Sequence, residues 1–257
     1  MPNAQSGGYR IHYEVEGAGP PLLLHQGYGL AARDWYDLGY VDALKHDYRL
    51  ILPDPLGQGE SDKPHSKEEY TPDRRVADVL AVLDAVNVDC THFWGYSMGG
   101  SIGFDFAVRR PDRLLSLILG GTSPRYSPPN VARAELLRQR GLQVFLESTE
   151  TAMSPFPPSV DERFLATADP EALAAATLVE RPGLEPHLRA INLPTLMYRG
   201  DKDNPQGDES ARQAADTMPN ATLVWLPGLN HVDGIVRSDL VLPHARAFLA
   251  GVLASAV

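Results

Sequence analysis

The sequence predicts an α/β fold with a mostly parallel central sheet and helices on both of its faces. Short apolar runs such as Leu22-Leu23-Leu24 are typical of strands that are buried on both faces. Segments with helical periodicity separate these runs, and strands that alternate with helices predict parallel pairing. The 257 residues are enough for one large domain or for a domain with an insertion.

The predicted strands and helices follow one another along most of the chain. Alternating apolar and polar residues over 9–15 predict a first, half-buried strand. The apolar runs predict further strands at 22–24, 50–52, 93–94, 114–119, 195–198 and 223–226. Helical patterns lie between them, at 31–45, 73–86, 98–109, 209–217 and 239–253.

The segment 124–190 interrupts this alternation. It contains no buried-strand pattern but two helical patterns, at 132–147 and 171–180, the second of which begins with a capping aspartate and a proline. Nine of the 22 prolines of the chain also lie in this segment. We therefore expect a helical cap that is inserted between two parts of a core, 1–123 and 191–257, and that lies over the strand ends. An extended helical connection without a role in binding is the alternative.

The composition excludes several classes of protein. Lys and Arg total 23 against 33 Asp and Glu, and a net charge of −10 disfavours binding to a nucleic acid or to an anionic membrane surface. Cys90 is the only cysteine, which excludes an internal disulfide and a cysteine-based metal site. Residues 1–10 show no signal-peptide pattern, and no apolar run approaches the roughly 20 residues that span a bilayer. We expect a cytoplasmic protein whose partner is a small molecule, and its oligomeric state stays open.

Residues 95–99 read Gly-Tyr-Ser-Met-Gly and lie between a predicted strand and a predicted helix. A serine on such a tight turn projects its hydroxyl above the sheet edge, and the turn leaves no room for side chains two residues before and after it. Gly95 and Gly99 meet that requirement. The helix N-terminus behind Ser97 supplies backbone N–H groups for a developing negative charge. The pattern often arises by chance, but its place between a strand and a helix favours a nucleophilic serine over a plain glycine-rich turn.

With these residues the sequence resembles the α/β-hydrolase family, and the resemblance covers nearly the whole chain outside the expected cap. Residues 26–29, Gln-Gly-Tyr-Gly, stand where the family usually has His-Gly-x-Gly. Residues 54–64 are similar to the loop after the family's next strand, with Gln58 where histidine is common. Asp203 and His231 follow the last two predicted strands, and the order Ser, Asp, His along the chain is the one that the family uses.

Ser97, His231 and Asp203 form the candidate catalytic triad that this resemblance implies. A serine hydroxyl is a poor nucleophile unless a neighbouring base removes its proton, and an imidazole can act as that base. A carboxylate must then hold the imidazole in the correct tautomer. The resemblance favours Asp203 for this role, and we interpret Asp201 as a turn residue. Positions 121–123, the other place for the acid, contain no carboxylate.

The resemblance also implies an oxyanion hole made by the backbone N–H groups of Tyr28 and Met98. Several aromatic side chains are candidates for the lining of a substrate pocket, and from them we expect an uncharged, partly hydrophobic substrate. These candidates are Trp35, Tyr126, Phe145, Phe156 and Phe164. His25 lies one position before the usual histidine of the family, and we interpret it as a strand residue and Gln26 as the family equivalent.

The predicted activity is hydrolysis of a carboxylic ester or a lactone through an acyl-enzyme, without a cofactor or a metal. The same fold and triad also perform carbon–carbon bond hydrolysis, thioester cleavage, acyl transfer and perhydrolysis, whereas epoxide and haloalkane hydrolysis would require an aspartate in place of Ser97. The three intact triad positions argue against a non-catalytic binding module. A remote alternative is an NAD(P)-dependent oxidoreductase that uses Gly27 and Gly29, because residues 27–32 match Gly-x-Gly-x-x-Ala and Asp54 lies 22 residues further on.

Overall fold

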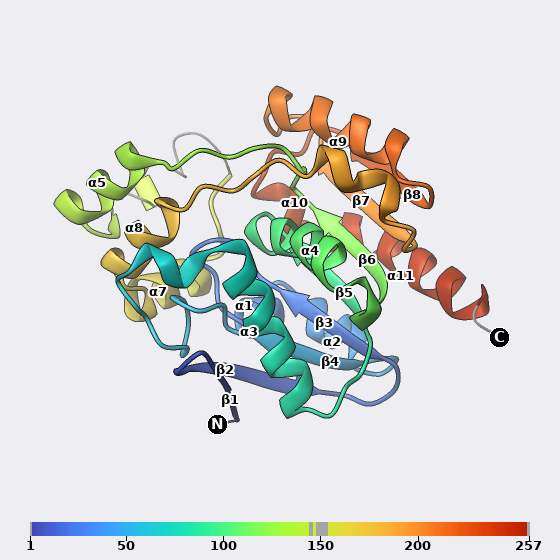
Figure 1. Ribbon diagram of the computed structural model, residues 1–257, viewed down its shortest axis with the longest axis horizontal. Coiled ribbons are helices and arrows are strands. Elements are labelled where there is room, and N and C mark those ends of the chain that lie inside the picture. The colour runs from blue at the N-terminus through green and yellow to red at the C-terminus, as the bar shows by residue number, and fades with distance from the viewer. Residues whose placement is uncertain (1, 144–145, 148–153, 256–257) are drawn as a thin grey trace.

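The computed structural model describes residues 2–143, 146–147 and 154–255, and it centres on an eight-stranded sheet (Figure 1). The strand order is β1-β2-β4-β3-β5-β6-β7-β8. The pairs β1–β2 and β2–β4 are antiparallel and the others are parallel, which confirms the mostly parallel sheet. The strands are β1 (Asn3–Ser6), β2 (Tyr9–Glu16), β3 (Pro21–His25), β4 (Arg49–Pro53), β5 (Thr91–Tyr96), β6 (Leu114–Gly120), β7 (Thr195–Gly200) and β8 (Ala221–Leu226).

Helices cover both faces of the sheet, as expected. The α-helices of the described residues are α1 (Asp34–Asp37), α2 (Tyr40–Leu44), α3 (Pro72–Ala85), α4 (Met98–Arg109), α5 (Val131–Arg140), α7 (Pro158–Thr167), α8 (Pro170–Thr177), α9 (Pro205–Thr217), α10 (Asp233–Val236) and α11 (Ser238–Ser255). Short 3-10 helices are η1 (Lys67–Tyr70), η2 (Pro111–Arg113) and η3 (Glu185–Ala190). The helices α3, α4 and α9 pack on one face, and α2 and α11 pack on the other (Figure 1).

The strand β3 shows why the apolar runs predict strands with two buried faces. Leu23 packs into the hydrophobic cluster that contains residues of α3 and α4, whereas Leu22 and Leu24 pack into the cluster that contains residues of α2 and α11. All three side chains are fully buried. Successive side chains of a strand point to opposite faces, and each buried leucine contributes about 1.5–3 kcal/mol to stability.

The helix predicted over 31–45 is wrong. The structure has two short helices there, α1 and α2, with Gly39 between them at a φ of 82°. This left-handed conformation ends a helix and suits glycine. Gly141 follows α5 at a φ of 69° and a ψ of −163°, another conformation that suits glycine, and α5 ends at Arg140 although the predicted helix extends to residue 147.

The segment 124–190 contributes the helices α5, α7 and α8 among its described residues, and Figure 1 shows them gathered on one side of the molecule. Ser127 and Arg181 form an antiparallel bridge within this segment. The helices share a small hydrophobic cluster, against which Tyr28 from the loop after β3 packs. The Tyr28 hydroxyl also donates to the Leu173 carbonyl oxygen at 2.8 Å. These contacts join the segment to the region next to Ser97, and its role as a cap stays a prediction.

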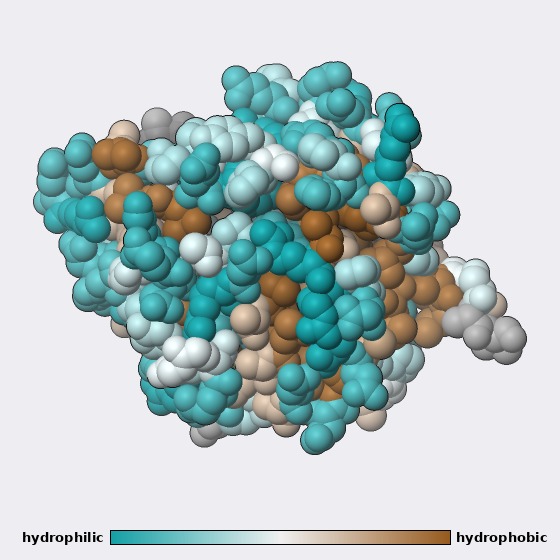
Figure 2. Space-filling view, in the orientation of Figure 1, coloured by the Kyte–Doolittle hydropathy of each residue, from teal (hydrophilic) through white to brown (hydrophobic). Residues whose placement is uncertain are grey.

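The surface shown in Figure 2 is mostly polar, because many of the apolar side chains are buried in the interior. On the face shown in Figure 2, hydrophilic residues cover most of the surface and hydrophobic residues are visible in smaller patches between them. In the part of the chain that the structure describes, no helix has the length and the apolar character needed to cross a membrane.

Candidate active site

Ser97 lies on the sharp turn between β5 and α4. Its φ of 54° and ψ of −112° are unusual for a residue with a side chain, and such local strain is typical of a nucleophile on a strand-to-helix turn. A Cβ atom on Gly95 would lie 2.2 Å from the Gly99 carbonyl oxygen, and one on Gly99 would lie 2.2 Å from the His25 carbonyl oxygen. Both positions therefore require glycine.

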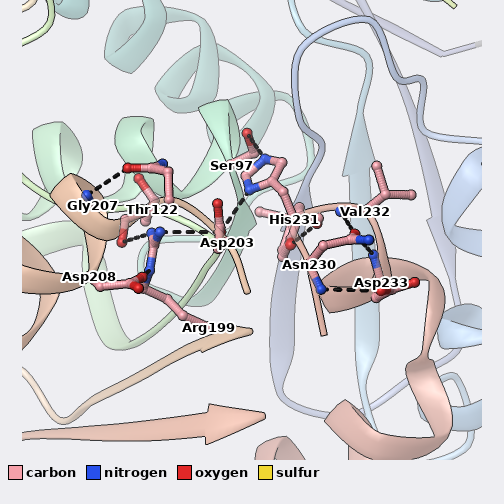
Figure 3. A network of polar contacts seen from close by, with 12 residues as sticks. Ser97, Thr122, Arg199, Asp203, Gly207, Asp208, Asn230, His231, Val232 and Asp233 are labelled. Carbon is pink, nitrogen blue, oxygen red and sulfur yellow. Dashed lines mark hydrogen bonds and ion pairs between the residues drawn. The ribbon is translucent and has the colours of Figure 1, made fainter. Parts of the chain in front are cut away.

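The structure brings the three residues of the candidate triad together (Figure 3). Nε2 of His231 lies 2.9 Å from Oγ of Ser97, and Nδ1 of His231 lies 2.9 Å from Oδ2 of Asp203. The three residues follow β5, β7 and β8, which run parallel in the same half of the sheet. The carboxyl ends of parallel strands meet at one edge, and this is why residues far apart in the sequence converge here.

The Asp203 carboxylate is almost fully buried and lies next to positive charge. Its Oδ2 lies 3.2 Å from Nη2 of Arg199, which also pairs with Asp208 at 2.9 Å and donates to the Thr122 carbonyl oxygen at 3.2 Å (Figure 3). Burial alone would raise the pKa of Asp203, but the hydrogen bond and charge of His231, together with the charge of Arg199, hold this pKa below its ordinary value. The carboxylate is therefore ionised at neutral pH and can stabilise an imidazolium.

Asp201, two residues before Asp203, has different contacts. Its side chain is exposed, and its Oδ1 accepts a hydrogen bond from the Gly228 N–H at 2.6 Å. This contact ties the loop after β7 to the loop after β8, as expected of a turn residue. The side chain that bonds to His231 is that of Asp203.

The loop that contains His231 is held by residues that the sequence reasoning missed. Asn230 Oδ1 accepts from the backbone N–H groups of Val232 and Asp233 at 2.9 and 3.0 Å. The Asp233 carboxylate accepts from the Asn230 N–H at 3.1 Å, and the Tyr96 hydroxyl donates to the His231 carbonyl oxygen. Asn230 lies three positions before the first residue of α10, and an asparagine in the turn before a helix is the sequence signal that could have identified this arrangement.

The two residues of the expected oxyanion hole line a cavity that Ser97 also lines. Met98 is the first residue of α4, and Tyr28 lies in the loop after β3. Gln58 holds this loop: its Oε1 accepts from the Gly29 N–H at 3.0 Å, and its Nε2 donates to the carbonyl oxygens of Gly27 and Leu30 at 2.9 and 2.7 Å. The sequence showed Gln58 only as a departure from the family pattern, although an amide is the side chain that can both accept and donate in this way.

His25 and Gln26 are buried behind the site. His25 is the last residue of β3, in agreement with its interpretation as a strand residue. Burial lowers the pKa of His25 to about 4, with an opposing effect of its hydrogen bond to the Gln26 carbonyl oxygen, so the ring is neutral at neutral pH. Gln26 is fully buried, and among the described residues neither atom of its amide group has a hydrogen-bond partner.

Two cavities meet at Ser97 and His231. Their volumes are about 460 and about 350 Å³, which suits a small-molecule site. The smaller cavity is lined largely by apolar side chains, which include Leu30, Leu146, Phe156, Val160, Phe164 and Ile235. The larger cavity is lined mainly by polar and charged side chains. The residues common to both are Tyr28, Ser97, Arg133, Asn204 and His231.

Only some of the aromatic residues that were expected to line the pocket do line a cavity beside Ser97. Phe156 and Phe164 line the smaller cavity. The expectation for Trp35 is wrong, because its side chain is 0% exposed and packs edge-to-face on Tyr40 in the hydrophobic core. The expectation for Tyr126 is also wrong, because its side chain is 49% exposed and lines neither cavity. Phe145 lies outside the described residues.

The residues of the dinucleotide alternative are engaged in structural contacts. The Asp54 carboxylate is buried, lies 2.7 Å from Nδ1 of His12 and accepts from the Ala32 N–H at 2.6 Å. The helix after the glycines is only the four-residue α1. Neither feature suits a ribose and pyrophosphate site.

In the described part of the chain, no group of three His, Cys, Asp or Glu side chains is placed to hold a metal ion.

Comparison with known proteins places this fold and site in a family. A model of the α/β hydrolase fold family matches residues 20–168, which is more than half of the chain. The chain belongs to the α/β hydrolase fold family. Its structure is similar to that of the enol-lactonase from Burkholderia xenovorans LB400, with 25% identity, a TM-score of 0.85, and coverage of 97% of this chain and 100% of that chain.

Two further proteins are similar over nearly the whole length. A thermophilic esterase from Thermogutta terrifontis, with malate bound in its structure, is 27% identical with a TM-score of 0.85, over 97% of this chain and 98% of that chain. A protein of Stutzerimonas stutzeri (strain A1501), provisionally named the carbamate hydrolase RutD, is 28% identical over 246 residues, 90% of this chain and 92% of its own. The chain is therefore an enzyme of the α/β hydrolase class.

Proposed function

We propose that this enzyme hydrolyses a carboxylic ester or a lactone through an acyl-enzyme on Ser97. The observation that supports the proposal is the unbroken chain of contacts from the Ser97 hydroxyl through His231 to the buried Asp203 carboxylate. Nucleophilic acyl transfer requires a hydroxyl, a base and a carboxylate that contact one another in this order. An enol-lactonase and an esterase are among the similar structures.

In the acylation step, Oγ of Ser97 attacks the carbonyl carbon while Nε2 of His231 takes the hydroxyl proton. Asp203 accepts the Nδ1–H hydrogen bond, which fixes the tautomer and stabilises the imidazolium. When the tetrahedral intermediate collapses, His231 returns the proton to the departing oxygen and Ser97 remains acylated. With a lactone, the departing oxygen stays tethered to the acyl group.

In the deacylation step, His231 takes a proton from a water molecule that attacks the acyl carbon. Collapse of the second tetrahedral intermediate releases the carboxylic acid, and His231 returns the proton to Oγ of Ser97. In both steps the negative charge develops on the former carbonyl oxygen. The backbone N–H groups of Tyr28 and Met98 are our candidates to bind it, and one such donor is worth about 2.7–4 kcal/mol in the transition state.

We infer that the segment 124–190 is a cap on a core formed by 1–123 and 191–257. The segment contributes Phe156 and Phe164 to the smaller cavity and Arg133 to both cavities. Arg163 pairs with Asp37 at 2.7 Å, which anchors α7 to α1. An extended connection without a role in binding would not line the cavities beside Ser97.

A substrate panel with a matched pair of variants tests the proposed function. We expect Ser97→Ala to lower kcat by at least about a thousandfold on every ester or lactone that the wild-type enzyme cleaves. Ser210→Ala is the control, because Ser210 lies on α9 and lines neither cavity. The panel includes thioesters, carbamates and carbon–carbon bond substrates. A preference for one of these substrates would leave Ser97 as the nucleophile but change the assigned reaction. Full activity of Ser97→Ala would overturn both the nucleophile and the reaction.

A further inference from the structure

Arginine side chains dominate the charged lining of the larger cavity beside Ser97. They reach it from α3, from the segment 124–190 and from β7. These residues are Arg75, Arg125, Arg133, Arg181 and Arg199. Asp105 is the one carboxylate in this lining among the described residues. The charge of the cavity therefore differs from the uncharged pocket that the aromatic residues of the sequence predict.

Two of the arginines are neutralised by the protein itself. Arg199 lies 3.2 Å from Asp203 and 2.9 Å from Asp208. Arg181 lies 3.5 Å from Oδ2 of Asp105. The three carboxylates therefore balance the positive charge of these two guanidinium groups.

Asp105 does not neutralise the rest of the lining. Its other oxygen, Oδ1, pairs at 2.7 Å with Arg109, which lies outside the cavity. Both of its oxygens thus face guanidinium groups, of Arg109 and of Arg181. Asp105 therefore forms no ion pair with Arg75, which lines the same cavity.

Arg75 is a cation of this cavity without an ion-pair partner among the described residues. Its side chain is half-buried, its Nε donates to the Tyr70 carbonyl oxygen at 3.3 Å, and its guanidinium carbon lies 5.4 Å from the centroid of the Tyr70 ring. Burial lowers the pKa of Arg75, with an opposing effect of Asp78, but an arginine remains charged in proteins. A cation that has lost part of its hydration favours the approach of an anion.

Arg133 places a second positive charge where the two cavities meet. It lines both of them, and its guanidinium carbon lies 4.6 Å from the centroid of the Tyr28 ring. Ser97 also lines both cavities. A bound molecule with one end at Ser97 can therefore extend into the positively charged lining.

We propose that the larger cavity binds a carboxylate group of the substrate, so that the ester or lactone cleaved at Ser97 is an anion. The proposal rests on the hydrolase function proposed above, because it names the substrate class of the same site. A guanidinium presents parallel N–H donors that match the two oxygens of a carboxylate. Arg75 is the main ligand in this arrangement, and the smaller apolar cavity receives the uncharged part of the substrate.

The net charge of the chain does not oppose this assignment. The chain has a net charge of −10, but the potential inside a narrow cavity follows the charges that line it. Besides the two neutralised arginines, the lining of the larger cavity includes four further side chains with N–H donors, which are Arg75, Arg125, Arg133 and Asn130. An anionic substrate is therefore attracted to this end of the site.

Matched pairs of substrates test the preference for charge. Monoethyl adipate and ethyl hexanoate differ by a carboxylate at the far end of the acyl chain, and 6-acetoxyhexanoate and hexyl acetate differ by one at the far end of the alcohol. We expect kcat/KM to be at least about tenfold higher for the charged member of one pair, which is the effect of one charge-assisted hydrogen bond. Equal or lower values for the charged members of both pairs would contradict the proposal.

Replacement of Arg75 tests whether this side chain causes the preference. We expect Arg75→Gln to reduce the charged-to-neutral ratio of kcat/KM by about tenfold or more, and Arg75→Lys to reduce it less, because lysine keeps the charge but not the paired donors. Arg49→Gln is the control, since Arg49 also donates to a backbone carbonyl, that of Val86 at 3.1 Å, but lines neither cavity. An unchanged ratio in Arg75→Gln would assign the preference to another group.

Binding to the Ser97→Ala variant separates this proposal from the hydrolase function. We expect calorimetry to show that adipate binds more tightly than the neutral adipamide, and that adding Arg75→Gln weakens adipate binding by about tenfold or more. If this holds but no ester or lactone is turned over by the wild-type enzyme, the carboxylate site stands and the hydrolase function fails. If adipate and adipamide bind equally, or if neither binds, the carboxylate site fails whatever the hydrolysis assays show.

Discussion

Asp201 and Asp203 lie two residues apart on one loop, but only Asp203 bonds to His231. We expect Asp203→Asn to lower kcat roughly 10³- to 10⁴-fold, because the amide no longer holds the imidazole in the productive tautomer. Asp201→Asn should change kcat by less than about tenfold, since it alters a single exposed turn contact. Steady-state kinetics on one ester substrate make the comparison. The reverse ranking of the two variants would show that the acid is misassigned.

His25 links the stability of the fold to pH. Its pKa falls from the ordinary 6.5 to about 4 on burial, so between these values the unfolded chain binds more protons than the folded one. Stability should therefore fall as the pH falls through this interval, by roughly 3 kcal/mol from this residue.

Urea unfolding between about pH 7 and about pH 4 tests this with His25→Gln as the reference, because glutamine does not titrate. The buried carboxyl groups of Asp34 and Asp78, whose pKa burial raises to about 6, act in the opposite direction, but they are common to both proteins. The difference between the two proteins thus isolates His25. Equal pH profiles would show that the ring is not buried in a neutral form.

At the scale of elements, the close approach of α4 to β3 depends on Gly99. A Cβ atom at this position would lie 2.2 Å from the His25 carbonyl oxygen, which belongs to the backbone and cannot rotate away. We expect Gly99→Ala to destabilise the fold by at least about 1–3 kcal/mol and to reduce activity with it. Gly251→Ala in α11 is the matched control, since nothing lies within 4 Å of its added Cβ.

The control should be neutral or should stabilise the fold by about 0.5–1 kcal/mol, because alanine favours a helix over glycine. Thermal or urea unfolding of both variants gives the comparison. Equal stability changes would mean that the contact between α4 and β3 is looser than the structure shows.

The loop after β3 depends on Gln58, which bonds to three of its backbone groups. We expect Gln58→Ala to lower kcat by roughly 10²-fold with a smaller change in KM, because a displaced loop weakens oxyanion binding in the transition state rather than substrate binding. Gln213→Ala, at an exposed position on α9, is the control. A change confined to KM would separate this loop from the chemical step.

At the scale of the whole molecule, the order of strands and helices was largely readable from the sequence. The apolar runs and the alternation over 9–15 predict seven of the eight strands. The run at 223–226 is not buried on both faces as expected, because β8 lies at the edge of the sheet and is mostly half-buried. The exception is β1 (Asn3–Ser6), whose residues are mostly polar and become a strand by pairing with β2. The break at Gly39 was missed because helical periodicity continues through it.

The candidate site was readable where residue type and strand order coincide. Ser97 and Asp203 follow the buried strands β5 and β7, His231 follows the edge strand β8, and parallel strands bring such positions to one edge of the sheet. The cavity lining was not readable, because an aromatic residue signals burial but not the place of burial, as Trp35 shows. The arginines of the larger cavity lie on separate elements without a shared motif, and only the folded chain brings them together.

Covalent labelling with diisopropyl fluorophosphate tests the central claim most directly, because the reagent reacts with a serine only when a base activates it. Intact-mass and peptide mass spectrometry should show one adduct per chain, on Ser97, with loss of esterase activity in proportion to labelling. The adduct should be absent from Ser97→Ala and strongly slowed in His231→Gln. An adduct on another residue, or labelling of Ser97 that does not depend on His231, would contradict the assignment of these residues as one catalytic unit.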